Sequence, residues 1–360
     1  MEILMKPKAA DYLIYDEQTG KYREDPEQIV RDDVEKHRWK RIGLTILKDW
    51  RLYVMLVPMI LVFFFWRYMP MYELLGSFKI HDEIVGVSEQ FYTGFSYFKQ
   101  LFSGEGTLSE DFWRAFRNTF LLSFYGLCFG FPMPIIIALF FNEIKSNIAR
   151  SVYQVLTYLP KFMSTVVMTS LITMLVRAAS PVAGIEMGVI SQLLVNIGVI
   201  SPEIGEIGIL NRPEYFRAIY KISGIWETAG YDSIVFFAAI VAIPPTSYEA
   251  AQIDGANKWA QMRYVVLPSI LSTIVIMLIT RIGSLLNVGY EKVLLLSDER
   301  NDTYETAEVV SSFANRYGFE NKSYSFGISS AAEMINNVIG MLLVIGANTI
   351  ARKVSDVSLY

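Results

Sequence analysis

Two charged side chains lie within long apolar stretches of the sequence, where a charge is costly. Arg281 follows Pro268 by thirteen residues, which corresponds to roughly 20 Å along a helix, and Glu227 lies in the preceding apolar stretch. An ionisable residue in such a place is a candidate functional residue. Either the two charges pair and fix the helix packing, or Arg281 faces a polar pathway and contacts hydroxyls or a carboxylate of a ligand.

A polar stripe continues from Arg281 along the same stretch. Ser284, Asn287 and Glu291 follow it at helical spacing, within about a third of the helix circumference. A face of this kind is expected to meet a cavity or a neighbouring helix and not lipid. The sequence therefore predicts one polar face on a single helix over 269–292.

A second group of polar residues forms the segment 244–268, between two apolar stretches. Its Pro-Pro pair ends the preceding helix. Thr246 is expected to cap a new helix, with Glu249 completing an S/T-x-x-E capping box, and Gly255 is expected to end that helix. We predict a short helix, a turn and a second helical piece outside the apolar layer of a membrane.

Six apolar stretches must position these residues, and each approaches or meets the roughly twenty residues that cross about 30 Å of hydrocarbon. They lie at 51–75, 118–141, 156–178, 216–243, 269–292 and 329–351. With 52% hydrophobic residues and a mean hydropathy of +0.33, the chain is more apolar than ordinary soluble domains. The sequence predicts an all-α polytopic membrane protein with six transmembrane helices.

The composition argues against several kinds of site. One cysteine and two histidines are too few for a disulfide framework or a zinc site. A net charge of −4, with no basic block among aromatic residues, argues against nucleic acid. The sequence also has no G-x-x-x-x-G-K-[ST] phosphate loop. We expect no metal, no cofactor, no nucleic-acid partner and no ATP site of that kind.

Basic residues before the first apolar stretch predict the orientation of the chain in the membrane. Those within about twenty residues of it are Lys36, Arg38, Lys40, Arg41, Lys48 and Arg51. This excess places the N-terminus in the cytoplasm, and six crossings return the C-terminus to the same side. The expected divisions are a tail at 1–49, a first helix with its external loop at 50–110, and a main transmembrane domain at 111–356.

The segment 244–268 resembles the signature loop of binding-protein-dependent ABC permeases. The resemblance is carried by E-A-A from Glu249, I-D-G-A from Ile253 and L-P from Leu267. Further segments, among them Asn118–Tyr125 and Asn287–Leu296, are similar to the large subfamily that imports complex oligosaccharides. The resemblance covers roughly residues 50–356 and implies the transmembrane domain of a type I ABC importer.

This resemblance also implies partners and a mechanism. The loop would form a coupling helix in a cleft of a separate ATPase, and its implied contact and turn residues are Glu249, Ala250, Ala251, Asp254, Gly255 and Ala256. A second permease, two cytoplasmic ATPase subunits and an extracytoplasmic solute-binding protein would complete an importer in a bacterial plasma membrane. ATP binding would open the membrane cavity outward, and hydrolysis would reset it.

A carbohydrate cargo would suit aromatic and short polar side chains in the spans, because sugars present both apolar CH faces and hydroxyls. The candidate residues of the substrate pathway are Tyr125, Trp226, Glu227, Tyr231, Arg281, Asn287 and Tyr290. Each aromatic ring could instead pack between helices or belong to the interfacial belt. A carboxylate of the cargo on Arg281 would make the sugar acidic.

Three other functions stay open at this point. A permease for another small solute or for peptides would share the coupling loop. A proton-coupled secondary transporter could use Glu227 or Asp232, but it leaves the loop unexplained. A membrane-embedded enzyme would need a nucleophile with a base, or a metal set, at membrane depth, and no predicted span contains a histidine or a paired carboxylate motif.

Overall fold

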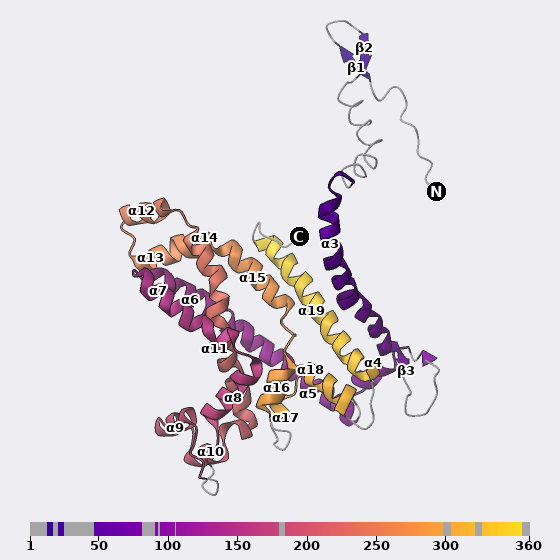
Figure 1. The fold of residues 1–360 in the computed structure, drawn as a ribbon, viewed down its shortest axis with the longest axis vertical. Helices are drawn as coiled ribbons and strands as arrows, with labels where there is room; N and C mark the ends of the chain where they lie inside the picture. The colour runs from indigo at the N-terminus through magenta and orange to yellow at the C-terminus, as the bar shows by residue number, and fades with distance from the viewer. Residues whose placement is uncertain are drawn as a thin grey trace. The chain divides into compact units, whose positions relative to one another are not determined.

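The computed structural model describes residues 13–16, 21–24, 47–80, 91–92, 94–104, 106–179, 184–297, 304–320 and 326–354. Helices dominate these residues (Figure 1), as the all-α prediction requires. The strands among them form two short antiparallel hairpins, β1 (Leu13–Asp16) with β2 (Lys21–Glu24) and β3 (Lys79–Ile80) with β4 (Phe91–Tyr92). The chain divides into two units, Met1–Tyr72 and Glu73–Tyr360, and each is described by itself.

The first unit contains most of the first predicted span, up to Tyr72. Helix α3 (Trp50–Phe63) continues through a π-helical turn at Phe64–Tyr68 into a 3₁₀ stretch that begins at Met69. Its residues are apolar on all sides and exposed, which suits a helix surrounded by membrane. The stretch Trp50–Phe78 is long and apolar enough to cross a bilayer.

The second unit contains the remaining helices. They are α4 (Ser96–Phe102), α5 (Thr107–Tyr125), α6 (Pro132–Glu143), α7 (Asn147–Tyr158), α8 (Thr165–Val176), α9 (Val189–Asn196), α10 (Pro202–Ile207), α11 (Pro213–Val241), α12 (Pro245–Ile253), α13 (Lys258–Gln261), α14 (Leu267–Ser269), α15 (Leu271–Gly283), α16 (Tyr290–Leu296), α17 (Tyr304–Ala307), α18 (Val310–Asn315) and α19 (Phe326–Val354). A π-helical turn at Gly126–Gly130 joins α5 to α6, and another, η9, covers Arg316–Glu320.

The six predicted spans are found if each bent pair of helices counts as one span. Within the described ranges, three helical stretches are long and apolar enough to cross a membrane directly, namely Trp50–Phe78, Thr107–Glu143 and Phe326–Lys353. Three further candidates are bent, by 103° between α7 and α8, by 69° between α11 and α12, and by 62° between α14 and α15.

Two predicted spans differ from the structure because each contains a break. The stretch 156–178 bends by 103° after Phe162, where Ser164 caps α8 by accepting a hydrogen bond from the backbone N–H of Val167. The stretch 269–292 is not one helix, since α15 ends at Gly283 and helix resumes only at Tyr290. Apolar composition identified the spans, but it carried no signal for either break.

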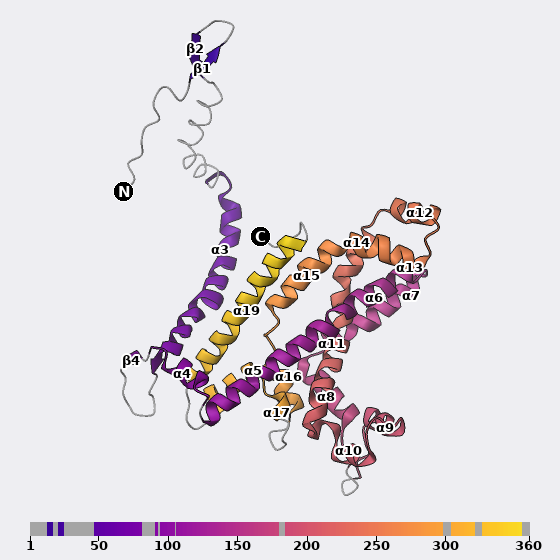
Figure 2. The ribbon, with the colours of Figure 1, turned by 180° about the vertical axis from the view of Figure 1, so that it is seen from behind.

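Helix α11 packs closely against α6 and α7, and the three lie side by side in both views (Figures 1 and 2). Ala138 of α6 shares a buried cluster with Phe236 and Ile240 of α11. Gly230 permits the approach to α7, because a Cβ atom at this position would lie 2.1 Å from the carbonyl oxygen of Thr157. The crossing therefore requires a residue without a side chain.

A buried ionic cluster joins α5 to the segment after α17, and we call it the Glu308 network. Glu308 has no exposed side-chain surface and accepts hydrogen bonds from Arg114 at 2.7 Å and from Arg316 at 2.8 Å. Asp111 accepts hydrogen bonds from Arg316 and from the hydroxyl of Tyr317, both at 2.9 Å. Two carboxylates and two guanidinium groups thus neutralise one another between elements far apart in sequence.

The Glu308 network also sets the protonation of its members. Burial alone would lower the pKa of Arg316, but the charges and hydrogen bonds of Glu308 and Asp111 outweigh it and raise that pKa. Burial and the hydrogen bond to Asp111 raise the pKa of Tyr317 to about 12. At neutral pH Arg316 is therefore charged, and Tyr317 keeps the proton that it donates.

We expect a Gly230→Ala substitution to destabilise the protein, because the added methyl group collides with backbone that cannot rotate away. Overpacking of this kind costs typically about 1–3 kcal/mol. The thermal midpoint of the purified protein in detergent should fall by several degrees. A Gly346→Ala substitution in α19 is the control, since a Cβ atom there meets nothing within 4 Å. Equal midpoints for the two variants would contradict the predicted collision.

A Glu308→Ala substitution should destabilise the protein more strongly. Removing one partner of a buried ion pair typically costs about 3–5 kcal/mol, and here two guanidinium groups lose their shared carboxylate. Glu305→Ala removes an exposed carboxylate one turn earlier and should leave the thermal midpoint nearly unchanged. The free energy of unfolding measured for both variants tests the difference, and similar values would show that the network contributes little.

Candidate functional site

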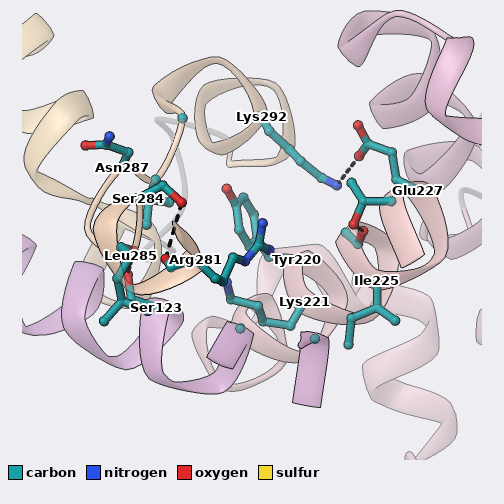
Figure 3. Close-up of a pocket in the computed structure, with 16 residues that line it drawn as sticks. Ser123, Tyr220, Lys221, Ile225, Glu227, Arg281, Ser284, Leu285, Asn287 and Lys292 are labelled. Carbon is teal, nitrogen blue, oxygen red and sulfur yellow. Dashed lines mark hydrogen bonds and ion pairs between the residues drawn. The ribbon is translucent and has the colours of Figure 1, made fainter. Parts of the chain in front are cut away.

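A cavity of about 270 Å³ lies where α5, α11, α15 and α16 meet, and Figure 3 shows its walls. Its lining side chains include hydroxyls, an amide and several charges. The lining residues are Ser123, Gly126, Gly130, Tyr220, Lys221, Gly224, Ile225, Glu227, Thr228, Arg281, Ser284, Leu285, Asn287, Val288, Gly289 and Lys292. A small, polar and charged space between apolar helices is the strongest candidate for a binding site among the described residues.

One ion pair crosses the cavity. The ammonium of Lys292 on α16 donates a hydrogen bond to Glu227 on α11 at 2.8 Å, and the two side chains are 11% and 16% exposed. Of the two alternatives considered for these charges, the pairing of Glu227 with Arg281 is not the one found, because Glu227 pairs with Lys292. Lys292 reaches Glu227 because the break after α15 turns the chain, which brings α16 back against α11.

The break between α15 and α16 forms one wall of the cavity. The backbone carbonyl oxygens in this break lack helical partners and accept hydrogen bonds from side chains of other elements. Ser123 of α5 donates to Leu285, Asn336 of α19 donates to Leu286 at 3.2 Å, and Ser311 of α18 donates to Val288 at 2.6 Å. Non-helical backbone at membrane depth is tolerated only where such partners or a cavity receive it.

This break corrects the predicted polar stripe. Arg281, Ser284 and Asn287 do line one cavity, but they do so from the end of α15 and the segment after it, and not from a single helical face. Glu291 is exposed and does not line the cavity. The prediction of a shared polar surface was right for three of the four residues, although its helical geometry was wrong.

Two glycines make room for the cations of the cavity. A Cβ atom at Gly126 would lie 3.0 Å from the ammonium nitrogen of Lys221, and one at Gly224 would lie 3.8 Å from that of Lys292. The aromatic ring of Tyr220 lies 5.5 Å from each of these two nitrogens. Bare backbone and one ring thus surround two ammonium groups that stand close to the cavity (Figure 3).

The predicted pathway residues are only partly brought together. Glu227, Arg281 and Asn287 line the cavity, whereas the four aromatic candidates, Tyr125, Trp226, Tyr231 and Tyr290, do not. Three of these rings are exposed on the surface of the chain, and Tyr125 is half-buried beside Phe124 and Phe129.

Sequence reasoning missed several cavity residues, of which Lys221 and Lys292 carry charge. Lys221, Gly224 and Thr228 share a helical face with Glu227, so the spacing on α11 could have identified Lys221. Lys292 lies 65 positions from its partner Glu227, and no local sequence pattern predicts that pairing.

The loop at 244–268 begins differently from its prediction. Helix α12 starts with Pro245 at its first position, and no side chain caps it. Thr246 therefore lies inside the helix, and the expected capping box with Glu249 is absent. Proline at this position replaces the cap, because its fixed φ suits the first turn and it has no N–H to satisfy.

The end of α12 agrees with its prediction. Gly255 has φ +77°, which glycine adopts at little cost. The N–H of Gly255 donates to Gln252 at 3.0 Å, and that of Ala256 donates to Ala251 at 2.9 Å. These two bonds form a Schellman motif, which satisfies the last carbonyls of a helix.

A second cap follows this turn directly. The side chain of Asn257 accepts a hydrogen bond from the N–H of Ala260 at 2.8 Å and so begins α13. The amide of Gln261 donates to the carbonyl of Ala256 at 3.0 Å. The loop therefore has a defined shape while its surface stays open, with Ile253 86% exposed and Trp259 67% exposed.

The six residues predicted from the sequence to contact a partner lie together at the end of α12 and in the turn after it. Four of them are exposed, namely Glu249, Ala250, Asp254 and Gly255, and the other two, Ala251 and Ala256, are half-buried. An open apolar tip beside acidic and small residues can enter a groove on another protein.

Comparisons with known proteins identify relatives of this chain. The family model described as binding-protein-dependent transport system inner membrane component matches residues 130–289, a range that includes α11, the loop and α15. Protein LplB of Bacillus subtilis is 33% identical over 314 residues, which are 87% of this chain and 92% of that protein. The polygalacturonan/rhamnogalacturonan transport system permease YteP of the same organism is 32% identical, over 90% of this chain and 95% of its own.

A solved structure is also similar over nearly the whole chain. It is that of a bacterial alginate ABC transporter in complex with an alginate pentasaccharide-bound periplasmic protein, and it matches with a TM-score of 0.74 and 36% identity, covering 89% of this chain and 100% of that one. Relatives of this similarity and coverage share the membrane fold. The chain therefore belongs to the binding-protein-dependent transport family, as a non-enzymatic membrane permease subunit of an ABC importer.

Proposed function

We propose that this chain forms part of the membrane pathway of an ATP-driven importer for a complex oligosaccharide. A second permease of similar fold would complete the pathway, two cytoplasmic ATPase subunits would supply energy, and an extracytoplasmic binding protein would deliver the cargo. The names of the relatives support a saccharide cargo, since one permease serves polygalacturonan and rhamnogalacturonan and the alginate transporter was solved with a saccharide-loaded periplasmic protein.

The observation that carries the proposal is the exposed, preformed loop at 244–268. A surface that keeps its shape without a partner loses little conformational entropy when it docks. Glu249, Ala250, Ala251, Asp254, Gly255 and Ala256 are the proposed contact and turn residues. ATP-driven closure of the ATPases would move α12 and, through the buried Ile243 at its root, would pull on α11.

Movement of α11 would reach the cavity directly. Lys221, Glu227 and Thr228 lie on that helix, whereas Arg281 and Asn287 face them from the other wall. Separation of these walls would change the size of the cavity and its access. Glu227, Arg281 and Asn287 are therefore the proposed pathway residues in this subunit.

The four aromatic candidates keep a separate proposed role. Tyr125, Trp226, Tyr231 and Tyr290 would contact the sugar outside this cavity, along a pathway shared with the second permease. The exposed rings of Trp226, Tyr231 and Tyr290 support this role, because a surface ring is available to a partner or to a passing ligand.

We further propose that both termini are cytoplasmic and that the divisions at 1–49, 50–110 and 111–356 are functional units. The basic residues before α3 support this orientation. Within the second unit, α12 and the final turn of α19, which carries Arg352 and Lys353, lie toward the same end (Figure 1).

A Gly255→Pro substitution should abolish ATP-dependent oligosaccharide uptake by the assembled transporter in proteoliposomes. Proline requires φ near −65°, so the turn after α12 cannot form. Gly255→Asn is the matched control, because asparagine tolerates the left-handed conformation, and it should retain most of the uptake. Membrane insertion of both variants is checked by protease protection. Normal uptake by the proline variant would contradict the coupling role of the loop.

The single cysteine, Cys128, allows the proposed pathway to be probed. In a Cys128→Ser background, Ser284→Cys and Asn287→Cys should react with a charged, water-soluble thiol reagent, because both positions line the cavity. Ile279→Cys, at a position only 2% exposed, should not react. Mass spectrometry of the labelled chain gives the extent of reaction. Failure of both cavity positions to react would show that water does not enter there.

A further inference from the structure

The charges that line the cavity do not cancel. Among the described lining residues are three cations, Lys221, Arg281 and Lys292, and one carboxylate, Glu227. Glu227 neutralises Lys292 through their 2.8 Å ion pair. Within the described part of the chain, no ion pair neutralises Lys221 or Arg281, so the lining of the cavity carries an excess of positive charge.

A nearby carboxylate does not remove this excess. Asp232 lies one turn beyond Thr228 on α11 and interacts electrostatically with Arg281. The same carboxylate also interacts with Lys161, so that one anion is shared between two cations. When the charges of Asp232 and Lys161 are both counted, the net charge around the cavity is unchanged.

Lys221 is half-buried and Arg281 is exposed in this chain, and cations between the apolar helices of a membrane are costly unless an anion or a polar cavity accompanies them. The guanidinium of Arg281 presents paired N–H donors that match the two oxygens of a carboxylate. Lys221 adds an ammonium that lies against the bare backbone of Gly126. Hydroxyls and an amide from Tyr220, Ser284 and Asn287 line the same space and can serve sugar hydroxyls.

We propose that the cavity selects acidic saccharides by binding a uronate carboxylate between Lys221 and Arg281, with Glu227 occupying Lys292 as a substitute for a second carboxylate. The inference rests on the proposed import of an oligosaccharide and adds the charge of the cargo. Glu227 is then a specificity-determining residue, because it decides how many cations of the cavity are available to the ligand.

The substitution of one carboxylate for another has a physical advantage. A substrate carboxylate that displaces Glu227 from Lys292 replaces one carboxylate with another. The ammonium of Lys292 is therefore paired with an anion before and after the exchange. The freed Glu227 can accept hydrogen bonds from hydroxyls of the same sugar. A neutral oligosaccharide offers no such exchange and leaves Lys221 and Arg281 without an anion.

The first test measures binding to the assembled transporter in nanodiscs. The probes are pentamers of galacturonate and of mannuronate, and the neutral controls are their methyl esters. Wild type should bind at least one acidic pentamer about ten-fold more tightly than its ester, since charge-assisted hydrogen bonds are strong, and salt should weaken only the acidic complex. Equal affinity for acids and esters would overturn the proposal.

The second test uses substitutions to identify which cations of the cavity recognise the carboxylate. Lys221→Gln and Arg281→Gln should each raise the Kd for the acidic pentamer about ten-fold and change the Kd for the ester little. Lys99→Gln is the matched control, because it removes an exposed cation from α4, and it should change neither value. Equal effects on acid and ester would assign Lys221 and Arg281 a packing role and overturn the proposal.

The two members of the ion pair should have opposite effects. Glu227→Gln frees Lys292 and should lower the Kd for the acidic pentamer several-fold, whereas Lys292→Gln leaves an unpaired carboxylate and should raise it. A purely structural pair would give weaker binding in both variants together with lower thermal midpoints. That symmetric result would overturn the role of Glu227.

The failure of this inference is distinguishable from failure of the proposed function. ATP-driven uptake of a neutral oligosaccharide with no preference for acids would overturn acid selection and leave the importer intact. Absence of ATP-driven uptake for every saccharide offered, acidic or neutral, would overturn the proposed carbohydrate import itself.

Discussion

The buried carboxylate of Glu308 holds the elements that enclose the cavity. It receives hydrogen bonds from Arg114 of α5 and from Arg316 after α18, and its own backbone carbonyl accepts from Asn118 of α5 at 3.0 Å. Asn118 in turn accepts from Arg217 of α11 at 2.8 Å. A connected polar network fixes geometry more firmly than isolated contacts, and here, among the buried side-chain atoms of the network's described residues, only the Nε atoms of Arg114 and Arg217 stay without a hydrogen-bond partner. The spacing of α5 and α11, which form two cavity walls, therefore depends on it.

Side chains from α5, α18 and α19 also provide hydrogen-bond donors for the non-helical backbone that follows α15. Carbonyl groups exposed within a membrane must find donors, and Ser123, Ser311 and Asn336 supply them from three different helices. Because these donors are fixed in place, the segment after Gly283 can stay non-helical and direct Asn287 toward the cavity. The non-helical segment is thus an ordered part of the site. Its hydrogen-bond donors both stabilise the backbone and fix its conformation.

Local patterns predicted the fold well and the site incompletely. Apolar length identified the spans, and Gly255 announced the end of α12, because both depend on neighbours along the chain. The bend after Phe162 and the pairing of Lys292 with Glu227 depend on contacts between distant segments. The Glu308 network was missed for the same reason, since its ion pair between Arg114 and Glu308 joins residues 194 positions apart. The capping box failed because proline at the first helical position removed the need for it.

The turn and cap between Ala251 and Gln261 are built almost wholly from atoms of that same segment. A segment whose shape is encoded within itself does not rely on the helices to which it is attached. On the docking role proposed above, permeases of one family would be able to exchange this segment as a unit, so that the choice of ATPase and the choice of cargo would diverge independently during evolution. On the same proposal, an engineer would connect this pathway to a different ATPase by exchanging the segment, without redesigning the membrane helices.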